Sequence, residues 1–489
     1  MRTVMDVVYN HTNAAGQGEK STFDKLVPGY YYRLNSDGTV ANSTCCSNTA
    51  TERTMMAKFT RDSLRVWAVD YKVDGFRFDI MGHMPKQLLV DIRSDMDALT
   101  LEDDGVDGSK ILLYGEGWNF GEVANDVRFP QATQINLQYT GVGTFDDRVR
   151  DAVRGGGPFD QDPRGQGFGS GLCVDSNGSG IDDLVGCSSA LEGTDVIKVA
   201  LSGSLAGVDE PAFSFVDSGG FDTWGFLVSY NGQPAGYTGD PTESISYVDS
   251  HDDTTLFDTL AFKLPPNTNS AARARAQIVS LSVPFLSQGT PFVVAGTDLL
   301  RSKSLDKNSY DSGDWFNAID WSGRTNGFGK GLPMYGDNNS RWDVAAETLA
   351  NPNNYVKPAD IKAAKDRFQD LLRIRYSTPL FRLGSAVEVA GRLKFPQGGE
   401  EQKQGVIAMQ LLSDGDELEP IDPRWKSVAV VFNATSRTAT ADIADWVDRG
   451  YVLHPVQAKG TDSIVKRSTL EQGTFTVPAR TVAVFVEPR

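Results

Sequence analysis

Short apolar segments alternate with amphipathic helical segments over most of this 489-residue chain, and this alternation constrains its fold more than any other feature. Repeated strand–helix units favour an α/β fold with a parallel sheet, because consecutive parallel strands need a long crossover that a helix can supply. A (β/α)8 barrel of the TIM type is the most economical arrangement of such units. The predicted strands are Thr3–Val8, Val73–Asp79, Ile111–Tyr114, Ile245–Val248 and Pro291–Val294. The predicted helices cover residues 56–71, a segment opened by Pro85, Ala271–Leu281 and a segment capped by Asp360.

The pattern changes near Gly384, where helical periodicity gives way to short apolar runs separated by turn residues. We therefore predict a barrel domain over residues 1–384 and a C-terminal antiparallel β-sandwich domain over residues 385–489. Two long insertions, at about residues 12–54 and 155–241, are predicted to be loops that shape a cleft in the barrel domain. The predicted strands of the C-terminal domain are Val387–Val389, Val406–Leu412, Val428–Phe432, Tyr451–Leu453, Phe475–Val477 and Val482–Val486.

The charge of the chain argues against several classes of partner. Its formal net charge is −17, and the acidic residues are spread along the sequence. Such a field repels nucleic acid and acidic membrane surfaces, so a neutral substrate is the natural expectation. The uncharged stretch from Ala276 to Thr297 contains Pro284 and Pro291, which favour a buried helix, a turn and a strand over a membrane span. No signal peptide is visible at the N-terminus. We also expect the protein to be a monomer.

The four cysteines leave several pairings open. Cys45 and Cys46 are adjacent, and Cys173 and Cys187 lie in a loop rich in glycine, serine and aspartate. Four cysteines allow three pairings, and four free thiols are an equal alternative to a bridge between Cys173 and Cys187. No Cys-x-x-Cys spacing is present, so neither zinc-finger nor thioredoxin-type chemistry is indicated.

Polar residues follow the predicted strands at the points where each strand ends. In a β/α barrel these carboxyl ends meet at one face, and active sites are built there. Side chains of a strand repeat every second residue, which places Arg77 on the same side as Asp79. The polar residues at these ends are Asp6, Asn10 and His11; Arg77 and Asp79; Glu116 and Trp118; and Asp249, His251 and Asp252.

This set of residues suits the cleavage of a glycosidic bond with retention of configuration. That reaction needs a carboxylate nucleophile and a carboxylic acid about 5–5.5 Å apart. Asp79 fits the nucleophile, with Arg77 keeping it ionised and oriented. Glu116 fits the acid, and apolar neighbours such as Trp118 would raise its pKa. Asp252 would stabilise the charged sugar ring and hold its hydroxyl groups.

Three of the four histidines lie near these strand ends. We interpret His11, His83 and His251 as donors to sugar hydroxyls, and His454 as structural. The rival interpretation is a barrel metallohydrolase, but no His-x-His pair occurs in the chain. Asp6 is interpreted as a buried, hydrogen-bonded support for the loops.

The motifs resemble a known family. Asp6–His11, Asp74–Asp79, Tyr114–Trp118 and the His251–Asp252 pair look like the four ordered motifs of the α-amylase superfamily of glycoside hydrolases. Further segments resemble those of type I pullulanases, the starch-debranching enzymes of that superfamily. These segments are Pro28–Tyr32, Ser43–Glu52, Gly75–His83, Gly115–Trp118, Leu300–Ser304 and Tyr310–Asn317.

The resemblance implies retaining hydrolysis of α-1,6-glucosidic linkages in pullulan, amylopectin and limit dextrins. It implies Asp79 as nucleophile, Glu116 as acid/base and Asp252 as transition-state stabiliser. The motif containing His11 ends the third barrel strand in this family. The resemblance therefore implies a barrel that lacks its first two β/α units, in an N-terminally truncated chain whose own activity is in question. Asp253 is a smaller departure, because asparagine is commoner there in the family.

Aromatic side chains and calcium are further expectations. Tyr30 and its neighbours either stack on glucose rings or pack the inserted loop, whereas Trp118 and Trp315 flank the cleft motifs and are expected to contact substrate. No cofactor is required. Calcium is an option that the family resemblance allows near Asn10 or in the inserted loops. The run from Asp175 resembles the start of a calcium loop, but its twelfth position is Gly186 instead of glutamate.

The sequence therefore predicts a debranching glycoside hydrolase that acts on an α-glucan polysaccharide or oligosaccharide. Isoamylase- or α-amylase-like specificity is an alternative within the same class. A fragment that binds glucan without turnover is an alternative outside it. Family habit implies an extracellular or periplasmic bacterial protein, with a plastid location as the alternative.

Overall fold

The structure is a computed structural model that describes residues 1–182, 188–208, 212–414 and 419–489. The chain forms two compact units. The first unit comprises Met1–Phe145 and Tyr237–Ile245, and the second comprises Asp146–Gly236 and Ser246–Arg489. The predicted boundary between residues 384 and 385 falls inside the second unit and stays a prediction about domain organisation.

The first unit is built on a parallel sheet. β1 (Val4–Val7), β4 (Gly75–Phe78) and β5 (Leu112–Gly115) are adjacent in that order, and β6 (Gly143–Asp146) follows β5. The register aligns Asp6 with Arg77 and Arg77 with Tyr114 across neighbouring strands. The bounds of β1, β4 and β5 lie within two residues of the predicted strands. The strand β6 was not predicted. The α/β class is therefore confirmed in this unit.

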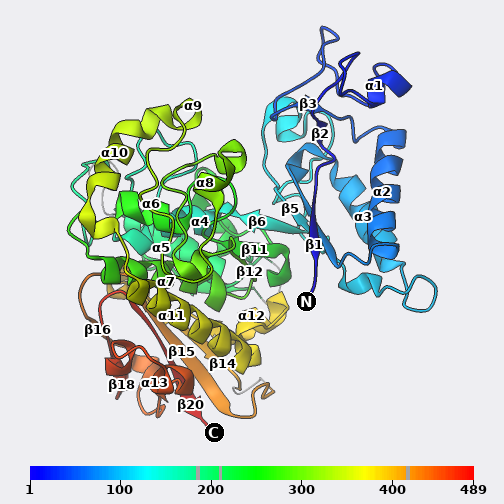
Figure 1. Cartoon of the computed structure of the whole chain (residues 1–489). Helices are drawn as coiled ribbons and strands as arrows, with labels where there is room; N and C mark the ends of the chain where they lie inside the picture. The colour runs from blue at the N-terminus through cyan, green and yellow to red at the C-terminus, as the bar shows by residue number, and fades with distance from the viewer. Residues whose placement is uncertain (183–187, 209–211, 415–418) are drawn as a thin grey trace. The chain divides into compact units, whose positions relative to one another are not determined.

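Two helices cover one face of this sheet (Figure 1). They are α2 (Thr54–Val69) and α3 (Lys86–Asp97), which contact each other and pack on β4 and β5. Phe76 and Phe78 are fully buried on that face, so the intervening Arg77 projects from the opposite face. The core that they share contains Leu64 and Ala68 of α2 and Leu88, Leu89, Ile92 and Met96 of α3.

The first predicted insertion is anchored by a small hairpin. β2 (His11–Thr12) pairs with β3 (Ser47–Asn48) in antiparallel fashion, aligning His11 with Asn48. The short helix α1 (Phe23–Leu26) lies between them in sequence. The chain thus returns from the insertion to the end of β1, where the candidate site residues stand.

The second unit contains most of the helices, together with several short strands. The longer helices are α4 (Asp147–Arg154), α5 (Ser188–Leu201), α6 (Leu256–Lys263), α7 (Ser270–Leu286), α10 (Trp342–Ala350) and α11 (Pro358–Ser377). The short helices are α8 (Gly313–Asn317), α9 (Tyr335–Asn338) and α13 (Pro455–Lys459). The short strands are β7 (Ser214–Val216), β8 (Asp222–Trp224), β9 (Ser229–Tyr230), β10 (Gln233–Pro234) and β12 (Thr290–Phe292), and β11 (Ser244–Tyr247) crosses from the first unit into the second.

Antiparallel sheets form the C-terminal part of the second unit. One sheet has the order β13 (Leu393–Lys394), β14 (Val406–Leu412), β15 (Trp425–Asn433), β20 (Thr481–Pro488) and β17 (Val452–Leu453). A second sheet has the order β16 (Ala439–Asp442), β19 (Thr474–Val477) and β18 (Thr469–Glu471). The two sheets share a core that includes Ala429, Val431, Phe475 and Phe485.

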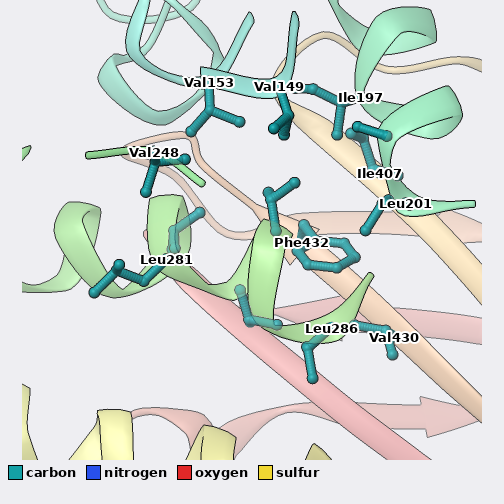
Figure 2. Packing of buried hydrophobic residues seen from close by; sticks show 14 of the residues in the cluster. Val149, Val153, Ile197, Leu201, Val248, Leu281, Leu286, Ile407, Val430 and Phe432 are labelled. Atoms are coloured by element: carbon teal, nitrogen blue, oxygen red, sulfur yellow. The ribbon is translucent and has the colours of Figure 1, made fainter. Parts of the chain in front are cut away.

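Helices and C-terminal strands of the second unit bury one continuous apolar core, part of which is drawn in Figure 2. Val149 and Val153 of α4 and Ile197 and Leu201 of α5 belong to the same cluster as Phe432 of β15. The helix α5 falls inside the segment that was predicted as the second insertion. The glycine- and serine-rich residues before it conceal its helical period in the sequence.

One strand predicted for the C-terminal domain is wrong, and one helix of the predicted barrel domain begins earlier than expected. The run Val387–Val389 belongs to a helix, α12 (Ala386–Arg392), instead of a strand. Ser385 caps this helix by accepting a hydrogen bond from the Glu388 backbone N–H, so a Ser-x-x-Glu start overrides the β-branched residues. Asp360 does not precede its helix but lies in the first turn of α11, where its carboxylate accepts from the Lys357 N–H.

Two further features of the fold are the state of the cysteines and the length and polarity of the helices. Cys45 and Cys46 are free thiols, and Cys173 is disulfide-bonded. Cys187 and Gly186 lie outside the described residues. Within the described ranges, no helix is both long enough and apolar enough to cross a membrane.

Candidate active site

Arg77 is the centre of a charged cluster on the open face of the first unit's sheet. It lies in the middle of β4, and its side chain is only 7% exposed. Its Nη1 donates to Asp6 Oδ1 at 2.7 Å and to Asp79 Oδ1 at 3.0 Å, and its Nη2 donates to Glu116 Oε1. Burial acts to lower the pKa of Arg77, but the carboxylates of Glu116, Asp6 and Asp79 raise it above its ordinary value. Arg77 is therefore a permanent cation that links the ends of β1, β4 and β5.

This arrangement confirms that Arg77 and Asp79 lie on the same side of the strand. Asp79 follows β4 directly, and its backbone N–H bonds to the Val7 carbonyl of β1. The prediction that Asp6 is hydrogen-bonded is confirmed by its contact with Arg77, but the prediction that it is buried is wrong. Its side chain is 54% exposed, because it lies on the sheet face opposite the helices that cover Phe76 and Phe78.

Glu116 follows β5 and lies among hydrogen-bond donors. One carboxylate oxygen accepts from Arg77, and the other accepts from the Ile80 backbone N–H at 2.8 Å. These two oxygens therefore face a guanidinium and an amide, and the expected apolar neighbours of Glu116 stay a prediction. Its side chain is 13% exposed and Asp79 is 23% exposed, so solvent reaches both carboxylates.

A strained turn presents the Ile80 amide to Glu116. Ile80 has φ +39° and ψ +48°, a left-handed conformation that is strongly disfavoured for a β-branched residue. Strain of this kind persists only where the surrounding contacts hold it in place. Gly82 supplies one such contact, because a Cβ at this position would overlap the backbone carbonyl of Trp118. The turn after β4 and the turn after β5 are therefore packed against each other backbone to backbone.

His11 borders the nucleophile candidate. Its Nδ1 lies 3.9 Å from Asp79 Oδ2, and the side chain is 13% exposed. Burial lowers the pKa of His11, although the Asp79 carboxylate partly offsets this effect. Neutral imidazole is consistent with the predicted role as a donor to sugar hydroxyls. Asn10 beside it is 1% exposed, and its amide group has no hydrogen-bond partner among the described residues.

His83 does not join this cluster at the surface. Its side chain is completely buried and packs against Phe120 with ring centroids 4.5 Å apart. Burial is the main cause that lowers the pKa of His83 to about 4. As placed in the structure, His83 is covered by protein and is not open to a sugar ring.

An ion-pair network that the sequence did not predict joins the first insertion to the loop after β5. Arg33 is fully buried and bonds to Glu52 at 2.9 Å and to Glu122 at 2.9 Å. Glu122 also accepts from Ser43 and from Asn48 Nδ2 at 3.0 Å. Burial acts to raise the pKa of Glu122, but the hydrogen bonds from Ser43, Arg33 and Asn48 lower it to about 2. These partners are up to 89 residues apart, so no local sequence pattern points to them.

Among the described residues, one set of three histidine, cysteine or acidic side chains has ligand atoms close enough to hold a metal ion. It consists of His11, Cys45 and Cys46, whose ligand atoms lie within 4.8 Å of one another. The predicted calcium start at Asp175 has another role, because its carboxylate accepts from the Ser436 N–H at 2.8 Å and pairs with Arg480.

The aromatic candidates differ in their surroundings. Tyr30 packs within the insertion, with the Arg53 guanidinium 5.5 Å from its ring centroid and its hydroxyl accepting from the Met55 N–H. Trp118 is half-buried beside the Glu116 turn. Trp315, in the second unit, is 65% exposed, and its indole N–H donates to the Lys330 carbonyl at 2.8 Å.

In the second unit, the loop after β11 carries the remaining acidic candidate. Asp252 and His251 are 70% and 55% exposed, with His251 Nε2 3.6 Å from Asp252 Oδ1. Asp249 is fully buried and accepts from the Thr297 hydroxyl at 2.6 Å, and burial raises its pKa. The loop thus begins at a buried anchor and ends with exposed polar groups.

Lys303 holds this loop, a role that sequence reasoning missed although the Leu300–Ser304 motif contains it. Its Nζ donates to the backbone carbonyls of His251 at 3.1 Å and Asp253 at 2.6 Å. Burial lowers the pKa of Lys303. The carboxylate of Asp253 lies 3.3 Å from Arg154 and 3.5 Å from Arg341, so two cations lie beside this acidic residue.

Comparison with known proteins decides the family. Residues 323–488 match the family described as alpha-1,6-glucosidases, pullulanase-type, C-terminal. The whole chain is 44% identical over 501 residues to "Pullulanase 1, chloroplastic" of Arabidopsis thaliana, of which it covers 51%. The chain belongs to the pullulanase family. It is also 39% identical to a pullulanase of Klebsiella pneumoniae over its full length, covering 44% of that protein.

Solved structures agree with the sequence comparison. The chain superposes on the maltotriose complex of PulA from Klebsiella pneumoniae with a TM-score of 0.93 and 38% identity. That match covers all of this chain and 51% of the other. The chain therefore spans about half the length of the pullulanases that it matches.

Proposed function

We propose that this chain carries the catalytic residues for retaining hydrolysis of α-1,6-glucosidic linkages in pullulan, amylopectin and limit dextrins. The observation that carries the proposal is that one guanidinium, Arg77, contacts both Asp79 and Glu116. A single guanidinium can do so only if the two carboxyl groups lie close together. Close spacing, about 5–5.5 Å, distinguishes the retaining from the inverting pair. Similarity to pullulanases along the whole chain supports the choice of substrate.

Asp79 is proposed as the nucleophile. Its carboxylate attacks the anomeric carbon while the bond to the leaving glucose breaks, forming a glycosyl ester on the enzyme. Arg77 donates to one Asp79 oxygen at 3.0 Å, which orients the carboxylate. Water then attacks the anomeric carbon from the face that the leaving glucose vacated and releases the Asp79 carboxylate, so the product keeps the α configuration.

Glu116 is proposed as the acid in the first step and the base in the second. It gives a proton to the departing glycosidic oxygen, and it later takes one from the attacking water. Both of its oxygens accept hydrogen bonds, from Arg77 and from the Ile80 N–H. The contact with Arg77 must weaken when Glu116 carries the proton, because a neutral carboxyl group accepts a hydrogen bond from a guanidinium less strongly than a carboxylate does.

Further residues are proposed to bind the substrate. Asp252 is proposed as the third acidic residue, which stabilises positive charge on the ring, and its 70% exposure supports access to substrate. His251, His11, Asn10 and Trp118 are proposed to contact sugar groups, and Trp315 is exposed enough to stack on a glucose ring. Tyr30 and His83 are proposed to shape the site through packing. The reaction needs no cofactor, and a structural calcium ion near Asn10 is an additional proposal.

The finer architecture is also a proposal. The parallel strands of the first unit are proposed to belong to a (β/α)8 barrel in which β1 corresponds to the third strand. The C-terminal sheets are proposed to form an antiparallel β-sandwich. We propose a monomer that meets its polymeric substrate outside a bacterial cell or in the periplasm. The relative named chloroplastic makes a plastid the alternative location.

Product analysis tests the proposed function. The chain is mixed with pullulan and, separately, with linear amylose, and the sugars released are identified. Maltotriose from pullulan, its initial α configuration and loss of activity in Asp79→Asn and Glu116→Gln would support the proposal. Cleavage of amylose alone, or near-parent turnover in either variant, would overturn it. Glucan binding without any product would show a binding fragment instead.

A further inference from the structure

A hollow lined by arginine side chains lies within the second unit, between α7 and the sheet that contains β19. Its volume of about 330 Å³ falls within the range of roughly 300–1,000 Å³ that small-molecule sites occupy. Arg275, Arg467 and Arg480 contribute to its wall, and no acidic residue among the described ones does. The basic hollow thus presents positive charge in a chain whose formal net charge is −17.

Arg480 brings donors to the basic hollow that the protein does not fully use. The residue is 9% exposed, and its Nε is buried without a hydrogen-bond partner among the described residues. Its Nη2 lies 3.4 Å from Asp175 Oδ2, which is longer than the roughly 2.7–2.9 Å of a strong charged pair. The Asp175 carboxylate is also engaged by the backbone N–H and the hydroxyl group of Ser436. The Arg480 guanidinium is therefore able to take a further anion.

The other two arginines add positive charge that the neighbouring carboxylate does not balance. Arg275 donates to Asp462 at 2.8 Å, but Asp462 also accepts from Arg367 at 3.0 Å, so one carboxylate serves two guanidinium groups. Burial is the main cause that lowers the pKa of Arg275, and the charges of Arg367 and Arg467 lower it further against the opposing effect of Asp462. Arg467 is exposed, and its side chain joins no hydrogen bond or ion pair among the interactions described.

We propose that the basic hollow binds a phosphate monoester carried on a group of about the size of a hexose. The planar fork of an arginine matches the oxygens of a phosphate group. A phosphate dianion accepts hydrogen bonds from Arg480 and Arg467, while Arg275 stays in its ion pair and adds to the positive potential. The volume of about 330 Å³ exceeds that of one phosphate group, so it leaves room for an attached ring.

The rest of the wall suits a sugar ring that is held mainly through its phosphate. Thr438 and Thr476 supply hydroxyl groups that both donate and accept, and Ile464 and Pro478 supply apolar surface for the C–H groups of a ring. No aromatic residue lines the hollow among the described ones, so stacking does not hold an uncharged sugar there. Two sources offer the required chemistry: a free hexose phosphate, and a phosphate ester on a glucan chain. The second source rests on the proposed function.

Calorimetric titration of the whole chain with glucose 6-phosphate tests the proposal. We expect one molecule bound per chain, weaker binding of inorganic phosphate and no binding of glucose at this site. Arg467→Gln should weaken binding of the ester at least about tenfold, because a charge-assisted hydrogen bond is lost. The matched control is Lys466→Gln, which removes the same charge from an exposed neighbour that does not line the hollow and should leave the affinity unchanged.

A phosphorylated maltodextrin distinguishes the two sources of the ester. Tighter binding of this maltodextrin than of glucose 6-phosphate would support an ester on a glucan chain, and the reverse order would support a free hexose phosphate. The proposal would be overturned if neither ester binds, if inorganic phosphate binds as tightly as the esters, or if Arg467→Gln and Lys466→Gln lose the same affinity. Because hydrolysis is not the readout, any of these failures would leave the proposed function standing.

Discussion

Replacement of Arg77 by methionine tests the physical account of the charged cluster. Methionine keeps much of the side-chain volume but removes the cation that faces Asp79 and Glu116. The Arg77 side chain is 7% exposed, and that of Glu116 is 13% exposed. Removing one partner of a buried ion pair leaves the other charge uncompensated and costs about 3–5 kcal/mol. We therefore expect the sheet of the first unit to lose about 3–5 kcal/mol of stability.

Hydrogen–deuterium exchange measures this loss locally. Peptides that cover β4 and β5 report on this sheet in the whole chain, separately from the second unit. A loss of 3–5 kcal/mol corresponds to exchange that is faster by a factor of roughly 10² to 10⁴. Asp6→Asn is the matched control, because Asp6 is 54% exposed and its contact with Arg77 is worth at most about 1 kcal/mol.

A double variant separates lost charge compensation from general damage. Adding Glu116→Gln to Arg77→Met removes the uncompensated carboxylate, so the double variant should exchange more slowly than Arg77→Met alone. The reasoning would be refuted if Arg77→Met costs no more than Asp6→Asn. It would also be refuted if the effects of Arg77→Met and Glu116→Gln simply add.

Three further predictions concern the surroundings of the site. Gly82→Ala should cost about 1–3 kcal/mol, because the new methyl group overlaps the Trp118 carbonyl, and thermal unfolding measures this loss. Glu122→Gln should cost about 1–3 kcal/mol at neutral pH. The pKa of Glu122 is lowered from 4.5 to about 2. Its stabilising contribution is therefore present above pH 4.5 and is lost as the pH falls toward 2. The stability of the Glu122→Gln variant should depend less on pH in that window. Lys303→Met should speed exchange at the His251 loop roughly tenfold while the enzyme fold persists, since two backbone carbonyls lose their donor.

Each of these three predictions has a control variant. Gly193→Ala in α5 meets no atom within 4 Å and should not destabilise the protein. Glu19→Gln changes an exposed carboxylate and should leave the pH dependence of unfolding unchanged. Lys307→Met should not alter exchange at the His251 loop, because no contact joins Lys307 to that loop among the interactions described. Equal effects in a variant and its control would contradict the corresponding prediction.

The sequence predicted those parts of the site that depend on local periodicity. Alternation along β4 placed Arg77 beside Asp79, and the structure confirms it because strand geometry repeats every two residues. The order of the strand ends placed Glu116 one unit later, within reach of the same guanidinium. The positions of these side chains follow from regular backbone geometry, which the pattern of residues in a single sequence is able to predict.

Other parts of the site depend on contacts that local patterns do not report. The left-handed Ile80 could not be predicted, because a β-branched residue is the least expected occupant of that conformation. Arg33 and Glu122 meet across 89 residues, and the burial of His83 follows from the same packing. The helix α12 was mistaken for a strand because its β-branched residues concealed the capping signal of Ser385.

Trapping the covalent intermediate tests the central claim, the assignment of Asp79 as nucleophile and Glu116 as acid/base, most directly. An α-glucosyl fluoride needs no acid to release fluoride, but breakdown of the glycosyl ester needs the base. Glu116→Gln incubated with such a substrate and quenched should therefore carry a glycosyl group on Asp79, identified by peptide mass spectrometry. A glycosyl group on another residue, or a β-configured product without any adduct, would contradict the account.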